Sequence, residues 1–315
     1  MWEGAFLCCG NIFPTSGISM SLQTHVGYIG LGNIGKPVAT RLISDAYSVH
    51  VFDVDQQAVQ SLVEQGATAC ESLAELASQC EHIGVCVRDD AQVESLLYGD
   101  AGLLSNAGAN TVIAIHSTVT QERLLKWSDD AWSCGIFLID APMTGGAHRA
   151  EAGTLCYMVG GDDAILDRSH PILMRSAEKV VHAGGVGAGI ALKLCNNFIQ
   201  YTEFVAMAEA TRLAEACGLS VDVLRDVGLS NGVVNEQMHM FVSARNSLAA
   251  SASDEDMQQI FGAMGALGSK DLECAIATAA AHSVTLPTAE YVRDRIEDVF
   301  LARDASRPAQ AGDCS

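Results

Sequence analysis

The spacing of the hydrophobic positions changes near residue 189, and this change predicts two parts with different architectures. Before it, short apolar runs bounded by turn residues alternate with helix-compatible stretches. Runs of this kind are typical of buried parallel strands connected by helices. The apolar runs lie at 26–29, 47–52, 83–87, 111–115, 136–139, 156–159 and 179–181, and helical segments lie at 91–98 and 121–127. The pattern predicts an α/β fold with a doubly wound sheet.

Beyond residue 189 the pattern is helical. The segment Ile190–Cys217 contains neither Gly nor Pro, is rich in Ala, Leu, Met and Glu, and is followed by Gly218. Because glycine commonly ends helices, we expect one long helix over this segment. Breaks at 230–232, 251–254 and 285–287 divide the remainder into further helices. We therefore predict an all-α second domain, joined to the sheet by the long helix.

The turn after the first apolar run carries the most informative motif of the chain. Gly30, Gly32 and Gly35 have the spacing G-x-G-x-x-G between a strand and a helix-compatible stretch. In this setting the first glycine permits a tight turn, the second lets backbone N–H groups approach a pyrophosphate, and the third lets the helix pack on the strand. Asn33 and Ile34 complete the turn at the positive helix end. We expect these five residues to bind a dinucleotide in a Rossmann-type domain; a glycine-rich turn in another α/β domain is the alternative.

An acidic residue supports the dinucleotide interpretation and bears on the choice of cofactor. Asp53 closes the second apolar run, where the adenosine ribose of a bound dinucleotide would present its hydroxyls. A carboxylate there accepts hydrogen bonds from a free 2′-OH and repels a 2′-phosphate. The following residues, 54–57, include no Arg or Lys that could hold that phosphate. NAD is therefore the expected cofactor, and NADP is disfavoured.

Length and motif positions together predict the domain organisation. We expect a loose N-terminal extension over 1–23, a dinucleotide-binding domain over 24–187, a helical substrate and oligomerisation domain over 188–303, and a disordered tail over 304–315. The acidic run at 254–256 is predicted to be a solvated loop or a helix start.

Charge and cysteine content limit the possible partners and compartments. The formal net charge is -20, with 18 basic and 38 acidic residues among 315, so there is no basic stripe for nucleic acid or anionic lipid. The 11 cysteines are scattered without a C-x-x-C pair, which argues against a disulfide framework and a zinc site. No apolar run reaches the length of a membrane span. We expect a cytoplasmic protein with a small-molecule substrate and no metal, nucleic-acid or membrane partner.

Residues at the carboxyl ends of the predicted strands are the first candidates for chemistry, since ligands bind there in open α/β sheets. Val87 and Arg88 follow one strand and are candidates for cofactor contacts, and Thr118 follows the next. The stretch Thr144-Gly145-Gly146 offers a hydroxyl and consecutive backbone N–H groups, which suits a carboxylate. An ordinary turn is the alternative for this stretch.

The long helix supplies a candidate acid/base. Lys193 and Asn197 are four residues apart and share one helix face beside an apolar stripe. A lysine at the edge of a buried seam loses hydration, which lowers its pKa and suits proton exchange with an alcohol or carbonyl oxygen. A structural lysine that snorkels between helices is the alternative.

Four motifs in order give the chain its resemblance to a known family. Residues 30–35, 140–146 with 152–155, 187–197 and 270–272 resemble the cofactor, substrate, catalytic-helix and late Lys-Asp elements of the β-hydroxyacid dehydrogenases. This family includes 3-hydroxyisobutyrate dehydrogenase and tartronate semialdehyde reductase, and the resemblance extends from about residue 25 to residue 301. It implies an NAD-dependent enzyme that interconverts a small 3-hydroxy acid and its semialdehyde or keto form, and that is commonly a homodimer or homotetramer.

The resemblance also implies roles for single residues. Lys193 would be the catalytic general acid/base and Asn197 would orient the substrate. Thr144, Gly145 and Gly146 would bind the substrate carboxylate, Lys270 would line the pocket near both substrate and nicotinamide, and Thr118 would lie at the nicotinamide end. Two departures from the family pattern, Thr144 in place of the usual Ser and Arg149 in place of a small residue, leave the identity of the acid open.

Three other interpretations compete with this one. An imine reductase shares the architecture but generally has another residue at the position of Lys193, and 6-phosphogluconate dehydrogenases have a longer helical part with phosphate-binding basic residues. A cofactor-binding scaffold or chromatin-associated module without catalysis is the alternative from a different class. Retention of Lys193, Asn197 and 144–146 favours the hydroxyacid dehydrogenase.

Overall fold

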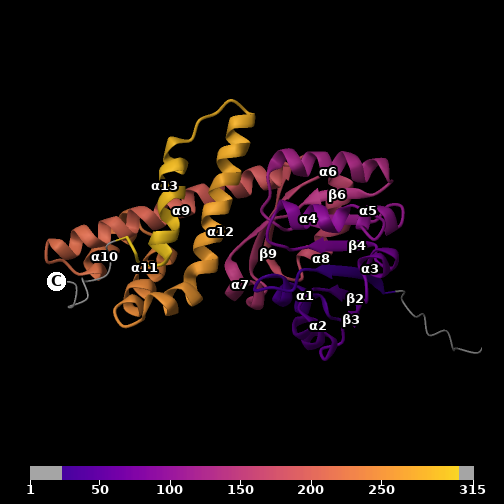
Figure 1. Ribbon diagram of the computed structural model, residues 1–315, viewed down its shortest axis with the longest axis horizontal. Coiled ribbons are helices and arrows are strands. Elements are labelled where there is room, and N and C mark those ends of the chain that lie inside the picture. Colours follow the sequence, from indigo (N-terminus) through magenta and orange to yellow (C-terminus); the bar gives the residue numbers. More distant parts are fainter. Residues whose placement is uncertain (1–22, 305–315) are drawn as a thin grey trace, which may run out of the picture.

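The structure, a computed structural model, describes residues 23–304 as a sheet covered by helices and an adjoining group of helices (Figure 1). The predictions for the N-terminal extension and the C-terminal tail lie outside the described residues, apart from Gln23 and Asp304. The predicted doubly wound sheet and the predicted helical region are both present.

The sheet has nine strands, six of which run parallel in the order β3-β2-β1-β4-β5-β6 among the described residues. These strands are β1 (Thr24–Ile29), β2 (Tyr47–Phe52), β3 (Thr68–Ala69), β4 (His82–Val85), β5 (Val112–Ile115) and β6 (Phe137–Asp140). Next to β6 the direction reverses, because β8 (Leu155–Gly160) is antiparallel to β6 and to β7 (Met143–Thr144), while β9 (Ala177–Gly184) is parallel to β8. The sequence pattern did not predict β3, β7 or this reversal.

Helices cover both faces of the sheet, and strand residues alternate between two apolar clusters. In β5, Val112 and Ala114 join one cluster while Ile113 and Ile115 join the other. The first face carries α1 (Gly35–Leu42), α2 (Gln56–Val63), α7 (Gly146–Ala152) and α8 (Asp163–Leu173). The second carries α3 (Leu73–Gln79), α4 (Asp90–Leu97), α5 (Leu103–Asn106) and α6 (Gln121–Ser133).

The predicted long helix is α9 (Ala188–Ala216), which runs from the sheet through the helical part (Figure 1). The other helices are α10 (Val221–Asn231), α11 (Glu236–Ala249), α12 (Asp254–Ala281) and α13 (Pro287–Phe300), so all three predicted breaks are confirmed. Gly232 ends α10 in the left-handed conformation, and Ser253 forms a capping box with Asp256 at the start of α12. The predicted helix start at 254–256 is therefore correct.

Close packing between α12 and α13 depends on small residues. A Cβ added at Gly268 would lie 3.1 Å from Ile296 Cγ1 and 3.2 Å from Tyr201 Cε1. The glycine lets α12 approach both α9 and α13, and Ile296 and Tyr201 belong to the apolar core that these helices share. This packing positions the middle of α12, including Lys270, against the sheet.

Among residues 23–304, no helix is both long enough and apolar enough to cross a membrane. The domain limits expected from the sequence stay a prediction.

Candidate active site

The three motif glycines have different physical roles. Gly30 has φ +90°, and a Cβ there would lie 2.2 Å from the carbonyl oxygen of Cys86; a Cβ at Gly35 would lie 1.9 Å from the carbonyl oxygen of Gly30. These two glycines are required by the protein's own packing. At Gly32, by contrast, a Cβ would meet no described atom within 4 Å. The open space beside Gly32, at the start of α1, fits a group that approaches the backbone closely, as a dinucleotide pyrophosphate does.

Asp53 is fixed at the end of β2 by backbone donors. Its Oδ2 accepts a hydrogen bond from Leu31 N at 2.5 Å, and its Oδ1 accepts one from Asp55 N at 2.7 Å. Because each carboxylate oxygen can accept about two hydrogen bonds, both oxygens keep capacity for ribose hydroxyls. The bond to Leu31 also joins the acid directly to the glycine turn, so both predicted cofactor elements form one unit.

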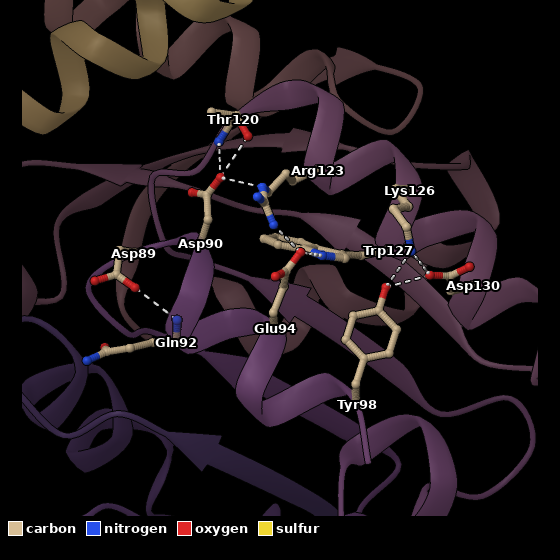
Figure 2. Close-up of polar contacts among 10 residues, drawn as sticks. All are labelled: Asp89, Asp90, Gln92, Glu94, Tyr98, Thr120, Arg123, Lys126, Trp127 and Asp130. Carbon is tan, nitrogen blue, oxygen red and sulfur yellow. Dashed lines mark hydrogen bonds and ion pairs between the residues drawn. The ribbon is translucent and has the colours of Figure 1, made fainter.

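Hydrogen bonds connect the loop after β4 to the loop after β5 at the same edge of the sheet. Val87 N donates to Ser117 Oγ at 2.9 Å, which connects the loop after β4 to the loop after β5. Asp90 Oδ2 accepts from Thr120 Oγ1 at 2.7 Å and from Thr120 N at 3.3 Å (Figure 2). The exposed Arg88 donates its backbone N–H to Gln92 Oε1 at 3.0 Å. The predicted cofactor residues Val87, Arg88 and Thr118 therefore lie on two loops held in register.

On the outer side of these loops, α4 and α6 are joined by polar contacts (Figure 2). Arg123 of α6 pairs with Glu94 of α4, whose carboxylate also accepts from Trp127 Nε1 at 3.3 Å. At the end of α4, Tyr98 OH donates to Asp130 Oδ2 of α6 at 2.5 Å. Exposed ion pairs contribute little to stability individually. Together these contacts connect α4, which begins at Asp90, to α6, whose N-cap residue is Thr120.

The predicted carboxylate-binding stretch forms a sharp turn between β7 and α7. Gly145 has φ +128° and Gly146 has φ +69°, conformations that favour glycine at both positions. The Arg149 side chain lies beside this turn, since a Cβ at Gly145 would be 2.9 Å from Arg149 Cβ and Cδ. The guanidinium of Arg149 pairs with Glu178 at 2.8 Å, on the exposed side of β9.

Lys193 points from α9 to the residue before Thr144. Its Nζ donates to the carbonyl oxygen of Met143 at 2.8 Å. Burial lowers the pKa of Lys193 below its ordinary value, the nearby Lys270 lowers it further, and Asp271 opposes the shift. The lysine predicted from the helix pattern thus lies beside the turn predicted to bind the carboxylate, and its lowered pKa suits proton transfer.

A buried carboxylate organises the remaining predicted residues. Asp271 Oδ2 accepts from Asn197 Nδ2 at 2.7 Å and from Tyr201 OH at 3.3 Å, and its Oδ1 lies 3.0 Å from Lys270 Nζ. Lys270 also donates to the carbonyl oxygen of Thr118 at 2.5 Å. The helical part therefore meets the loop after β5, which carries the predicted cofactor residue Thr118, at Lys270.

The structure brings the predicted residues together as two adjoining groups. The first contains the glycine turn with Asp53, and the second contains Lys193, Lys270, Asn197 and the turn at 144–146. Sequence reasoning gave no role to Asp271, although it follows Lys270 in the late motif, or to Asp140. Among the described residues, no group of three His, Cys, Asp or Glu side chains could hold a metal ion.

Comparison with known proteins matches the sheet region and the helical region to two known domain families. Residues 25–185 match the NAD-binding domain of 6-phosphogluconate dehydrogenase, and residues 187–308 match the NAD-binding domain of NADP-dependent 3-hydroxyisobutyrate dehydrogenase. The chain is 34% identical over 239 residues to 2-(hydroxymethyl)glutarate dehydrogenase of Eubacterium barkeri, covering 75% of this chain and 79% of that one. The chain belongs to the β-hydroxyacid dehydrogenase family.

Two further relatives agree with this assignment. An uncharacterised oxidoreductase of Mycobacterium tuberculosis is 37% identical over 278 residues, covering 86% of this chain and 92% of that one. The solved structure of Mycobacterium tuberculosis 3-hydroxyisobutyrate dehydrogenase with L-serine superimposes with a TM-score of 0.77 at 27% identity, covering 90% of this chain and all of that one. This family membership confirms the predictions of a Rossmann-type sheet followed by helices and of NAD as the cofactor, while the preference for NAD over NADP stays a prediction.

Proposed function

We propose that the protein is an NAD-dependent dehydrogenase that interconverts a small 3-hydroxy acid and its semialdehyde or keto form. The observation that carries this proposal is the position of Lys193, whose amine lies against the Met143 carbonyl at the substrate turn with its pKa lowered by burial. Membership of a family of oxidoreductases that act on hydroxyacids supports the same reaction.

Each part of the site has a distinct task in this reaction. The open space at Gly32 and the carboxylate of Asp53 would hold the pyrophosphate and ribose of NAD. When bound, NAD supplies the hydride acceptor for oxidation. The Lys193 amine takes the proton from the substrate hydroxyl during oxidation, and its ammonium returns that proton to the carbonyl oxygen during reduction. Asn197, held by Asp271, orients the substrate.

The substrate carboxylate binds at the turn 144–146 and near Lys270. Thr144 offers a hydroxyl, and the left-handed conformation of Gly145 and Gly146 allows successive backbone N–H groups to face one anion. Lys270 provides the positive charge in a chain whose net charge is -20. Analogues without the carboxylate should therefore be poor substrates.

The test is a panel of small 3-hydroxy acids and their semialdehydes with wild-type protein and three variants. Lys193→Ala should bind NAD normally and lose about 10²–10⁴ in kcat, the usual cost of a lost general acid/base. Lys193→Arg should be similarly inactive, because arginine keeps the charge and does not release its proton. Lys179→Ala, at an exposed position on β9, is the matched control and should retain full activity.

Two results would contradict the proposal. Near-wild-type activity of Lys193→Arg across a pH series would remove Lys193 from the mechanism. Turnover of cyclic imines in preference to hydroxy acids would identify an imine reductase, and NAD binding without turnover of any substrate would identify a scaffold.

We propose further that the enzyme is a homodimer or homotetramer in the cytoplasm. Supporting association, α12 exposes Ile260, Met264 and Leu267, which are spaced four and three residues apart and so lie on one face. Supporting the compartment, exposed cysteines such as Cys134 and Cys195 are free thiols. Sedimentation of the full chain and cell fractionation test these two statements.

A further inference from the structure

One buried carboxylate lies between the substrate turn and the helix that carries Lys193. Asp140 is the last residue of β6 and is fully buried. Its Oδ1 accepts from Gly187 N at 2.8 Å, and its Oδ2 accepts from Ile190 N at 2.6 Å. The first residues of α9 are thus bound to the end of a strand that lies 47 residues earlier in the chain.

This carboxylate substitutes for a local helix cap. The N-cap residue of α9 is Gly187, which has φ +91° and no side chain to accept from the first N–H groups. Backbone donors at a helix start require acceptors, and a negative charge there is favoured by the helix dipole. Asp140 lies outside α9 and supplies both the acceptor oxygens and the negative charge.

The surrounding backbone leaves Asp140 little freedom to move. A Cβ at Gly160 would lie 2.4 Å from Asp140 Oδ1, and a Cβ at Gly189 would lie 2.9 Å from Asp140 Oδ2. Two glycines on different elements therefore make room for the carboxylate and enclose it. Burial raises the pKa of Asp140 to about 6, so at neutral pH it is mainly in the ionised form that accepts both bonds.

Asp140 is connected to Lys193 in two ways, through the chain that leads to Met143 and through its hydrogen bond to the start of α9. The chain runs from Asp140 through Pro142 to Met143, whose carbonyl accepts from Lys193 Nζ at 2.8 Å. Lys193 lies about one helical turn after Ile190, which donates back to Asp140. Any shift of the start of α9 relative to β6 changes the distance between the lysine and the substrate turn.

We propose that Asp140 is a positioning residue, which holds Lys193 at a fixed place relative to the turn that binds the substrate. The inference rests on the proposed function, since it assigns Asp140 a role through the acid/base Lys193. Asp140 itself does not exchange protons with the substrate. It fixes the start of α9 to the same strand end from which the substrate turn departs.

The test compares Asp140→Asn with Asp162→Asn. Asp162 caps α8 through a bond to Ala164 N at 3.0 Å and is exposed, so it provides the same substitution at a helix start away from α9. Asp140→Asn should lower kcat about 10²-fold, as expected for a displacement of the order of 1 Å. KM for the acid should change far less, NAD affinity should be unchanged, and Asp162→Asn should keep wild-type kcat.

Hydrogen–deuterium exchange gives a readout that does not depend on activity. The segment 186–194 should exchange roughly tenfold faster in Asp140→Asn, because a cap is lost, and at the wild-type rate in Asp162→Asn. The acidic limb of the kcat–pH profile should also move upward in Asp140→Asn, since a Lys193 amine displaced toward water regains its ordinary pKa. A structural cap alone would not move this limb.

Several results would overturn the inference. The first is an unchanged kcat of Asp140→Asn. The second is an unchanged acidic limb of its kcat–pH profile although segment 186–194 exchanges faster. The third is a loss of NAD affinity without a change in kcat. If Asp140→Asn does not fold, Asp140→Ser, which keeps one uncharged acceptor, provides the same measurements. If wild-type protein turns over no hydroxy acid, the proposed function has failed, while exchange of 186–194 still decides whether Asp140 holds the helix start.

Discussion

At the scale of single residues, the cofactor site combines glycines required by packing with an acid held by backbone donors. The Asp53 carboxylate accepts from Leu31 N on one side and from Asp55 N on the other, so these two bonds fix its position at the end of β2. A 2′-phosphate at the same place would meet a fixed negative charge. We therefore expect discrimination between NAD and NADP to depend on the Asp53 side chain.

We expect higher kcat/KM with NAD than with NADP, and Asp53→Ala should reduce the ratio roughly tenfold, since hydrogen bonds to charged groups contribute about 1.5–3 kcal/mol. Steady-state kinetics with both cofactors measures the ratio. Asp55→Ala is the matched control, because Asp55 caps α2 through Gln57 N and Ala58 N. A wild-type preference for NADP would show that Asp53 does not select the cofactor.

Two buried histidines make stability depend on pH. Burial lowers the pKa of His82 to about 3 and that of His116 to about 4, from an ordinary value of 6.5. The unfolded chain therefore binds more protons than the folded chain below pH 6.5. The free energy of unfolding is therefore highest above pH 6.5 and falls as the pH is lowered toward 4. Each histidine lowers it by up to about 1.4 kcal/mol per pH unit in this range.

His82→Phe should flatten this dependence, because both ring nitrogens of His82 are buried without a hydrogen-bond partner among the described residues. Urea unfolding at pH 7, 6 and 5 measures the slope. His148→Phe, at an exposed position, should leave the slope unchanged. Equal slopes in wild-type protein and His82→Phe would contradict the assignment.

At the scale of helices and strands, long periodic segments could be predicted and long-range contacts could not. The absence of Gly and Pro over 190–217 was enough to predict α9, and turn residues marked every helix after it. Strands β3 and β7 have two residues each, too few to form a pattern. Asp140 and Asp271 reach their partners across 47 and 74 residues, and a single sequence contains no signal for such pairs. Even so, Asp140 directly follows the apolar run 136–139, and a buried acid at such a position is unusual.

Packing of α12 depends on Gly268, so Gly268→Val should destabilise the protein by about 1–3 kcal/mol through overpacking against Ile296 and Tyr201. Urea unfolding measures this loss. Gly262→Val is the matched control on the same helix, because the atoms nearest to an added Cβ there all belong to the flexible side chain of Gln258. Equal stability of the two variants would show that α12 and α13 can separate without cost.

At the scale of the whole molecule, the sheet and the helical part are joined near the active site by a small number of polar contacts. Lys270 donates to the Thr118 carbonyl at 2.5 Å, and Gln121 connects three elements. Gln121 Nε2 donates to the Gly187 carbonyl at 3.0 Å, and Gln121 Oε1 accepts from His282 Nε2 at 2.7 Å. The side chain therefore bridges the first turn of α6, the residue before α9 and the end of α12.

Gln121→Leu keeps the side-chain size and removes both bonds, each of which contributes about 0.5–1.5 kcal/mol. Because the proposed substrate site contains residues of α9 and α12 while the proposed cofactor site lies on the sheet, we expect KM for the acid to rise roughly tenfold and NAD affinity to stay constant. Gln60→Leu, at an exposed position on α2, is the control. A parallel loss of NAD affinity would mean that Gln121 stabilises the cofactor loops rather than the junction between the two parts. Unchanged kinetics would leave Lys270 as the contact that sets their relative position.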